Sequence, residues 1–268
     1  MVVFPNAKIN LGLNITKKRS DGYHNIESVF IPIPISDALE ITINDREKLK
    51  FTSTGLDIPS DGKPNLVERA WLILNAEFNI PTVDLDLLKK IPIGAGLGGG
   101  SADAANALIG LNELFNLNLS EKKLLSLASQ LGADCAFFVK NKPVYAKGIG
   151  SDFSDLSIDL KGFNFVVIYP NIHVSTSEAY KHVNPKESIK NIRTILKQPI
   201  ETWKKELIND FESSVFKQFP EIEKIKKALY NSGAIYASMS GSGSTLFGIF
   251  REAPSKNQFK NLGQRWDF

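Results

Sequence analysis

The sequence contains very little cysteine. Cys135 is the only one among 268 residues, so the chain cannot form an intramolecular disulfide or bind a metal through a cluster of cysteines. A single thiol is typical of a protein from a reducing compartment. No apolar run reaches the ~18 residues that a membrane span needs, and the first residues lack the pattern of a secretory signal. We therefore expect a cytoplasmic protein without membrane contact.

An excess of charge of one sign is also missing. Thirty-two Lys and Arg residues stand against 29 Asp and Glu residues, which leaves a formal net charge of +3. Several lysines occur late in the chain, but they are mixed with glutamates on stretches of helical spacing, which indicates a solvated face. Nucleic-acid binding is not expected, because no basic surface with interleaved aromatic residues is evident. The length and the 43% hydrophobic content fit a globular protein of one large domain or two.

Glycine, by contrast, is concentrated in one place. The stretch IPIGAGLGGGSADAA, residues 91–105, has five glycines in seven residues and leads into a helical pattern that starts at Ser101. Partial alternation of apolar and polar residues predicts a strand over 83–91. A strand, a glycine loop and a helix N-terminus together present free N–H groups to an anion, which predicts a phosphate-binding site. A glycine-rich surface turn is the alternative.

The loop does not fit the familiar nucleotide-binding motifs. Gly94, Gly96 and Gly99 match the dinucleotide pattern GxGxxG, but that pattern alone is weak. A Walker A loop needs a lysine directly before its Ser or Thr, where this chain has Gly100. Protein kinases need HRD and DFG elements, which the sequence lacks. These differences disfavour a P-loop NTPase and a protein kinase.

Hydrophobic periodicity predicts an α+β protein with mixed sheets in two domains. The expected strands cover 8–16, 28–35, 39–43, 49–52, 83–91, 144–147, 163–169, 235–239 and 246–250. The expected helices cover 66–78, the stretch from 101, 119–131, 177–182, 189–196, 203–208, 211–216 and 222–232. The polar run from Gly148 to Ser157 is expected to join the two domains, 1–150 and 151–268.

Two charged residues stand out because their neighbours are apolar. In PNAKINLGLNI, strict alternation puts four residues on one strand face: Lys8, Asn10, Gly12 and Asn14. That face is either solvent-exposed or the floor of a ligand site. In LGADCAFFV, Asp134 either caps the next helical turn or, with a lysine nearby, takes a proton from a hydroxyl. The residues alone leave both alternatives open.

Two further stretches are candidates for ligand contact. Tyr23 and His24 follow a turn in SDGYHNIESVF. They either hold a flat ring, or Tyr23 packs on the core while His24 is solvated. The stretch SGSGST, residues 240–245, lies between two predicted strands and is too short for a linker. It favours a second phosphate-contacting loop.

In order and spacing, these motifs resemble the GHMP kinase family. The resemblance is carried by AKINLGL (7–13), DGYHNIESVF (21–30), PIGAGLGGGSADAA (92–105), GADCAFF (132–138) and MSGSGST (239–245). It implies an N-terminal ATP-binding domain and a C-terminal substrate-binding domain, with mixed sheets packed against helices and the active site in the cleft between the domains. The chain departs from the usual family pattern at Ala102, Cys135 and Ala136, and near Ser151, where the family often carries an acidic residue.

The resemblance also implies a reaction. This is the ATP-dependent phosphorylation of the 2-hydroxyl of a cytidine-diphosphate-linked methylerythritol, a step of the non-mevalonate isoprenoid pathway, with Mg²⁺ as cofactor and no obligate protein partner. Kinases for mevalonate, homoserine or a sugar are the alternative enzymes, but they would not need the Tyr23–His24 pair. A non-catalytic nucleotide-binding protein is an alternative of another class, and it has no reason to keep both Lys8 and Asp134.

Carried over position by position, the resemblance assigns roles to individual residues. Asp134 is the expected general base, and Lys8 orients and supports it electrostatically. The expected ATP phosphate loop consists of Pro92, Ile93, Gly94, Ala95, Gly96, Leu97, Gly98, Gly99, Gly100, Ser101 and Ala102. The expected substrate contacts are Asn10, Tyr23, His24, Ser240, Gly241, Ser242 and Gly243, of which Tyr23 and His24 would bind the cytosine.

Overall fold

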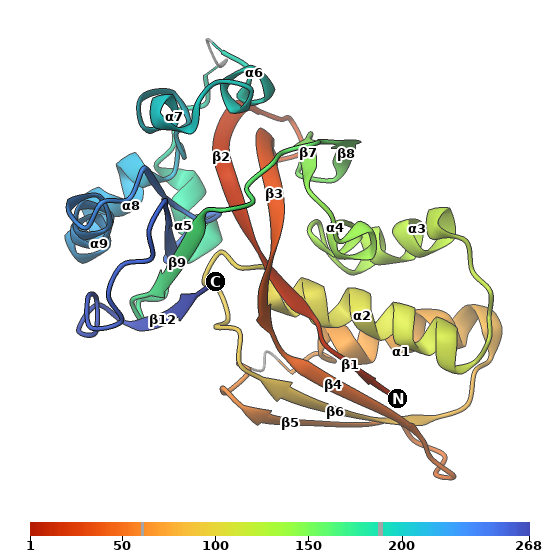
Figure 1. The fold of residues 1–268 in the computed structure, drawn as a ribbon. Coiled ribbons are helices and arrows are strands. Elements are labelled where there is room, and N and C mark those ends of the chain that lie inside the picture. The colour runs from red at the N-terminus through yellow and green to blue at the C-terminus, as the bar shows by residue number, and fades with distance from the viewer. Residues whose placement is uncertain (60–61, 187–189) are drawn as a thin grey trace. The chain divides into compact units, whose positions relative to one another are not determined.

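Strands and helices follow one another in groups along the chain (Figure 1), and a computed structural model describes residues 1–59, 62–186 and 190–268. These residues form two compact units, each discontinuous in sequence. Unit 1 comprises Met1–Lys8, Pro32–Ile93 and Gly98–Lys142, and unit 2 comprises Ile9–Ile31, Gly94–Leu97 and Pro143–Phe268. The units therefore differ from the continuous segments 1–150 and 151–268. The expected division of ATP and substrate binding between domains stays a prediction.

Unit 1 contains a mixed four-stranded sheet. Its order is β1 (Val2–Val3), β4 (Ala38–Ile43), β6 (Val83–Lys89) and β5 (Lys50–Gly55). Strand β5 runs parallel to β6, whereas β4 is antiparallel to both of its neighbours. A parallel pair needs a crossover connection, and helix α1 (Leu66–Phe78) lies within it. A capping box formed by Asn65 and Glu68 starts α1, at the residue where the sequence predicts the helix.

Helices cover one face of this sheet (Figure 1), where α1 and α2 (Gly99–Leu114) lie side by side. A Cβ atom placed on Gly110 of α2 would lie 2.8 Å from Ile41 Cδ1 of β4, so the helix sits directly on the strand. Unit 1 is completed by α3 (Glu121–Leu131) and α4 (Cys135–Lys140). The N-terminus of α2 is thus held against a buried sheet, which is a rigid support for a site at that end.

Unit 2 contains most of a long antiparallel pair, β2 (Asn6–Lys18) and β3 (His24–Ser36), extended by β7 (Val144–Lys147) and β8 (Asp152–Asp155). A second sheet has the order β10 (Tyr236–Met239), β11 (Leu246–Phe250), β9 (Asn164–Tyr169) and β12 (Gln264–Asp267). Its helices are α5 (Thr176–Lys181), α6 (Ile192–Leu196), α7 (Ile200–Glu206), α8 (Glu212–Gln218) and α9 (Pro220–Asn231). Leu13 and Ile15 of β2 share one core with residues of β9, β11, α8 and α9.

Most predicted elements are confirmed, and the differences have physical reasons. The stretch 148–157 is not a domain junction, because β8 pairs with β7 inside unit 2. Strand β1, helix α4 and strand β12 were not predicted, because their sequences VV, CAFFVK and QRWD show neither a regular alternation nor a helical spacing of apolar residues. Ile189, in the helix predicted over 189–196, lies outside the described residues, and α6 begins at Ile192. No described helix has the length and hydropathy needed to cross a bilayer.

Candidate functional site

The glycine loop connects strand β6 to helix α2. Gly94, Gly96 and Gly98 all have positive φ angles, at 65°, 79° and 72°, which L side chains rarely adopt. The helix begins at Gly99 rather than Ser101, and Ser101 lies in its first turn. Ala95, Leu97 and Gly99 are buried, so the loop is not a simple surface turn. The backbone N–H groups of the first turn have no partner within the helix and suit an anion.

In unit 2, the second glycine–serine stretch supports the middle of this loop. Residues 240–245 join β10 to β11 as a hairpin connection. Ser240 Oγ donates to Gly96 O at 2.8 Å, and Thr245 N donates to Ala95 O at 3.2 Å. A Cβ atom on Gly96 would lie only 2.0 Å from Ser240 O. The two glycine-rich stretches, far apart in sequence, therefore pack backbone against backbone.

In unit 1, Lys8 and Asp134 meet at the start of α2. Lys8 Nζ lies 3.5 Å from Asp134 Oδ2, with the lysine side chain 5% exposed and the aspartate side chain 32% exposed. A Cβ atom on Gly98 would lie 3.2 Å from Lys8 Cε and 2.9 Å from Phe138 Cζ. The buried cation is thus next to the helix N-terminus, and the carboxylate beside it stays open to solvent.

For each of these two residues, the structure excludes one of the alternatives that the sequence left open. Asp134 is the residue before α4, but its side chain makes no capping hydrogen bond, so the interpretation as a side-chain cap is wrong. Lys8, Asn10 and Asn14 are 4%, 2% and 7% exposed, so their strand face is not solvated. Both faces of β2 are buried from Ala7 to Ile15.

Asn10 lies in unit 2 within a chain of buried hydrogen bonds. Its Nδ2 donates to Ser28 Oγ at 2.9 Å, and Ser28 Oγ donates to Gly12 O at 2.6 Å. Asn10 Oδ1 lies 3.4 Å from Ser240 Oγ. The single hydroxyl proton of Ser240 has a shorter bond to Gly96 O, so that bond is the stronger of the two. The structure therefore brings Asn10, Ser240 and Gly96 together.

Tyr23 and His24 line a pocket of about 610 Å³ in unit 2. Tyr23 is 63% exposed, so it does not pack in the core. The imidazole of His24 stacks on Tyr180 of α5, with ring centroids 4.7 Å apart and planes 18° apart. Burial and the nearby Lys18 ammonium lower the pKa of His24. Tyr180 also lines the pocket, and sequence patterns could not point to it because its contact with His24 joins distant segments.

A second pocket, of about 800 Å³, lies in unit 1 beside α2 and includes Ile93, Gly100 and Asp103. Beneath it, Lys89 Nζ donates to Asp103 Oδ2 at 2.8 Å and also to Asp37 Oδ2. Lys89, Asp37 and Asp103 are each at most 2% exposed. Burial, together with the charge of Asp37, raises the pKa of Asp103 to about 7 despite the Lys89 ammonium.

This buried cluster was not predicted, although the sequence holds a signal for it. In β6, Lys89 lies on the same face of the strand as Val83, Leu85 and Leu87, all of which are buried. A charged residue on the apolar side of a strand needs a buried partner of opposite charge. Among the described residues, no group of three or more His, Cys, Asp or Glu residues is placed to hold a metal ion.

Two family models match this chain. The GHMP kinases N terminal domain matches residues 65–142, and the GHMP kinases C terminal model matches residues 188–267. The chain belongs to the GHMP kinase family. The resemblance carried by the sequence motifs is therefore confirmed, and as a member of the GHMP kinase family the chain is an ATP-dependent small-molecule kinase.

Individual members of the GHMP kinase family are similar over nearly the whole chain. The 4-diphosphocytidyl-2-C-methyl-D-erythritol kinase of Bacteroides fragilis is 56% identical over 252 residues, which cover 93% of this chain and 92% of that protein. A crystal structure of 4-(cytidine 5'-diphospho)-2C-methyl-D-erythritol kinase matches with a TM-score of 0.83 and 31% identity, covering 100% of this chain and 98% of that one. Homoserine kinase from Cytophaga hutchinsonii matches with a TM-score of 0.71 at 18% identity, covering 98% and 93%, and shares the fold.

Proposed function

We propose that this kinase phosphorylates the 2-hydroxyl of 4-diphosphocytidyl-2-C-methyl-D-erythritol with ATP, a step of the non-mevalonate isoprenoid pathway. The observation that carries the proposal is the 56% identity to a kinase of that name over 93% of the chain. The Lys8–Asp134 pair at the start of α2 supports it, because a buried cation beside an accessible carboxylate suits phosphoryl transfer to an alcohol. The single cysteine fits a cytoplasmic location.

Asp134 is the proposed general base. Its carboxylate accepts the proton of the substrate hydroxyl while that oxygen forms a bond to the γ-phosphorus of ATP. The bond between the γ-phosphorus and the β,γ-bridging oxygen breaks, and ADP leaves with that oxygen. Lys8 orients the Asp134 carboxylate and offsets negative charge on the phosphoryl group in transfer. Both roles rest on the 3.5 Å separation of Nζ and Oδ2.

The proposed ATP loop is Pro92–Ala102. Its last residues, Gly98–Ala102, cap and begin α2, so their N–H groups and the helix dipole favour the phosphates. The pocket of about 800 Å³ includes Ile93 and Gly100 of the same loop and has room for a nucleoside. Mg²⁺ would enter with the phosphates and neutralise part of their charge, since it keeps several waters and needs only one or two protein ligands.

The proposed site for the cytidine end of the substrate is the pocket of about 610 Å³. Tyr23 presents an exposed ring to stack on cytosine, and stacking on Tyr180 sets the plane of the His24 imidazole. Asn10 and the backbone of residues 240–243 are proposed for the methylerythritol and diphosphate part. The Ser240 hydroxyl already donates its hydrogen bond to Gly96 O, so its side chain is not proposed as a donor to the substrate.

The test is an assay of the purified protein with ATP, Mg²⁺ and a panel of alcohols. The panel contains 4-diphosphocytidyl-2-C-methyl-D-erythritol, mevalonate, homoserine and a hexose, and ADP release and the mass of the product are measured. We expect turnover with the cytidine-linked substrate alone. Turnover with mevalonate or homoserine but not with that substrate would contradict the proposal. Nucleotide binding without any transfer would indicate a non-catalytic protein.

A further inference from the structure

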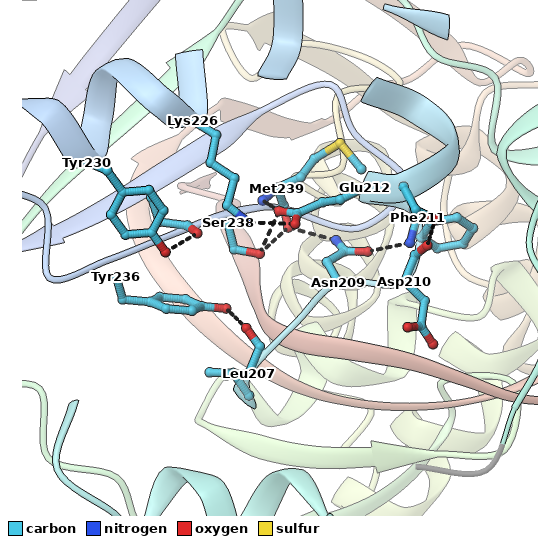
Figure 2. Close-up of polar contacts among 12 residues, drawn as sticks. Leu207, Asn209, Asp210, Phe211, Glu212, Lys226, Tyr230, Tyr236, Ser238 and Met239 are labelled. Atoms are coloured by element: carbon cyan, nitrogen blue, oxygen red, sulfur yellow. Dashed lines mark hydrogen bonds and ion pairs between the residues drawn. The ribbon is translucent and has the colours of Figure 1, made fainter. Parts of the chain in front are cut away.

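A buried polar cluster surrounds the short segment between α7 and α8 (Figure 2). The segment is Ile208–Phe211, followed by Glu212 as the first residue of α8. Asn209 is 3% exposed and Glu212 is 8% exposed. Neither residue carries a role in the proposed reaction. Both lie in unit 2.

On one side, the segment is hydrogen-bonded to strand β2. Leu13 N donates to Ile208 O at 2.8 Å, and Asp210 N donates to Leu13 O at 2.8 Å. The carboxylate of Asp210 also accepts a bond from Ile15 N at 2.7 Å. The segment therefore runs along β2 for a short distance, and its position relative to that strand is fixed by three bonds.

On the other side, the segment holds the end of β10 (Figure 2) and also the loop after it. Asn209 Nδ2 donates to Met239 O and to Gly241 O, both at 2.8 Å. Glu212 Oε1 accepts bonds from Met239 N at 2.8 Å and from Ser238 Oγ at 3.1 Å. Lys226 Nζ donates to the second oxygen of Glu212 at 2.5 Å. The two carbonyls bound by Asn209 belong to the residues on either side of Ser240.

Ser240 connects this cluster to residues Gly94–Leu97 of the proposed ATP loop, which belong to the same unit. Ser240 Oγ donates to Gly96 O at 2.8 Å. With Met239 O and Gly241 O both held by one amide group, the backbone at Ser240 has little freedom to rotate. We propose that Asn209 is a positioning residue of the ATP phosphate loop, acting through Ser240 on Gly96. The inference rests on the proposed function only in taking Gly94–Leu97 to bind ATP phosphates.

The chemistry of the position favours an amide. Two buried carbonyl oxygens need donors, and an asparagine NH₂ group supplies two. Asn209 Oδ1 accepts a bond from Phe211 N at 3.0 Å, which fixes the orientation of the amide. An aspartate would keep the acceptor and the shape but would place negative charge against both carbonyls. Asn209→Asp therefore removes the link to the loop while changing the volume very little.

The experiment measures nucleotide affinity and stability in the full-length protein. ATP dissociation constants are determined by calorimetry, and the KM for ATP and kcat are determined with the cytidine-linked substrate. The matched control is Tyr236→Phe, which removes the buried bond from Tyr236 Oη to Leu207 O (3.0 Å) in the same cluster but does not touch the loop. Melting temperatures are recorded for both variants.

We expect Asn209→Asp to raise the Kd and the KM for ATP by about tenfold, because the carbonyls around Ser240 lose both donors. At saturating ATP, kcat should recover to within about threefold of the wild type, since Lys8 and Asp134 are unchanged. Tyr236→Phe should lower the melting temperature by a similar amount and leave both ATP constants unchanged. A purely structural role would lower the melting temperature of both variants and change neither constant.

Equal ATP affinity of wild type and folded Asn209→Asp would overturn the inference and leave the proposed function intact. Absence of ATP binding by the wild type would overturn both. If Asn209→Asp does not fold, Ser240→Ala tests the same link, because it removes only the hydroxyl that reaches Gly96. An unchanged ATP Kd in Ser240→Ala would then overturn the inference, whereas a weaker affinity would support it.

Discussion

Lys8 Nζ and Asp134 Oδ2 lie 3.5 Å apart in unit 1, although one residue comes from β2 and the other from the turn before α4. Asp134→Asn keeps the shape of the side chain but cannot accept a proton. We expect kcat to fall by about 10²–10⁴-fold, the usual contribution of a general base, while the ATP Kd stays within about twofold. Steady-state kinetics and calorimetry check this. Glu121→Gln, which removes an exposed ion pair with Lys140, is the control, and a comparable kcat in both variants would contradict the role of Asp134.

Lys8→Met keeps most of the side-chain volume but removes the ammonium. Because Lys8 is only 4% exposed, a nonpolar replacement of similar length should preserve the packing. We expect the main loss in kcat, since the charge supports both the carboxylate and the phosphoryl group in transfer. Initial rates at varied ATP give the two constants. If only the KM for ATP rose, Lys8 would be a phosphate anchor.

Gly96→Ala should weaken both folding and nucleotide binding. The residue has φ +79°, and a Cβ atom would lie 2.0 Å from Ser240 O, so the backbone must move apart at a cost above about 2 kcal/mol in unfolding free energy. Gly100→Ala is the matched control, because its Cβ would meet only Leu66 Cδ1 at 3.9 Å. It should change stability by no more than about 1 kcal/mol, in the stabilising direction. Urea unfolding compares them, and equal stabilities would contradict the packing of the two loops.

Tyr23 offers a clean test of substrate identity, because a residue that is 63% exposed contributes little to the core. Tyr23→Ala should lose roughly 1–3 kcal/mol of binding to the cytidine-linked substrate, on the order of 5- to 150-fold in Kd. Tyr23→Phe should lose much less, since the ring remains, and the ATP Kd should not change in either variant. Equal losses in the two variants would point to the hydroxyl instead of stacking. No loss in either would remove Tyr23 from the substrate site.

Asp103 should make stability depend on pH. The folded protein keeps the Asp103 proton up to a pKa of about 7, above the ordinary 3.8, so between these values the folded state binds more protons than the unfolded chain. Stability should therefore fall as the pH rises from about 4 to 7, by at most about 1.4 kcal/mol per pH unit from this group. Asp103→Asn should flatten that slope in urea unfolding at pH 5, 6, 7 and 8. The exposed Asp86→Asn should keep it, and identical slopes in all three proteins would contradict the assignment.

Local sequence patterns predicted those helices and strands whose apolar residues recur regularly or whose ends carry turn or capping residues. Helix α1 was predicted over its full length from the helical spacing of its apolar residues, and in the structure Asn65 caps it. The motifs also pointed to Lys8, Asp134 and both glycine-rich stretches. Periodicity could not separate a capping Asp134 from a carboxylate facing a lysine, since the two differ only in a contact between distant segments.

Residues whose importance comes only from long-range contacts were missed. In the sequence, Tyr180 is an ordinary tyrosine of a helical segment, and only the structure shows that it stacks on His24. In the sequence, Asn209 is a polar residue in a loop, which is common and uninformative. Only the structure shows that its amide binds the carbonyls of Met239 and Gly241. The position of Lys89 on the apolar face of β6 indicated a buried partner of opposite charge. The sequence could not identify that partner, because Asp37 and Asp103 lie on other elements.

The discontinuous composition of unit 2 also governs how the chain folds as it leaves the ribosome. Leu13 and Ile15 are synthesised long before Leu246 and Phe250, although all four residues belong to one core. Part of this core therefore stays incomplete until β11 has been translated, although β9 residues such as Val166 and Ile168 are available earlier. Contacts of such long sequence separation also slow folding. A fragment that stops before β10 would leave Leu13 and Ile15 without these partners.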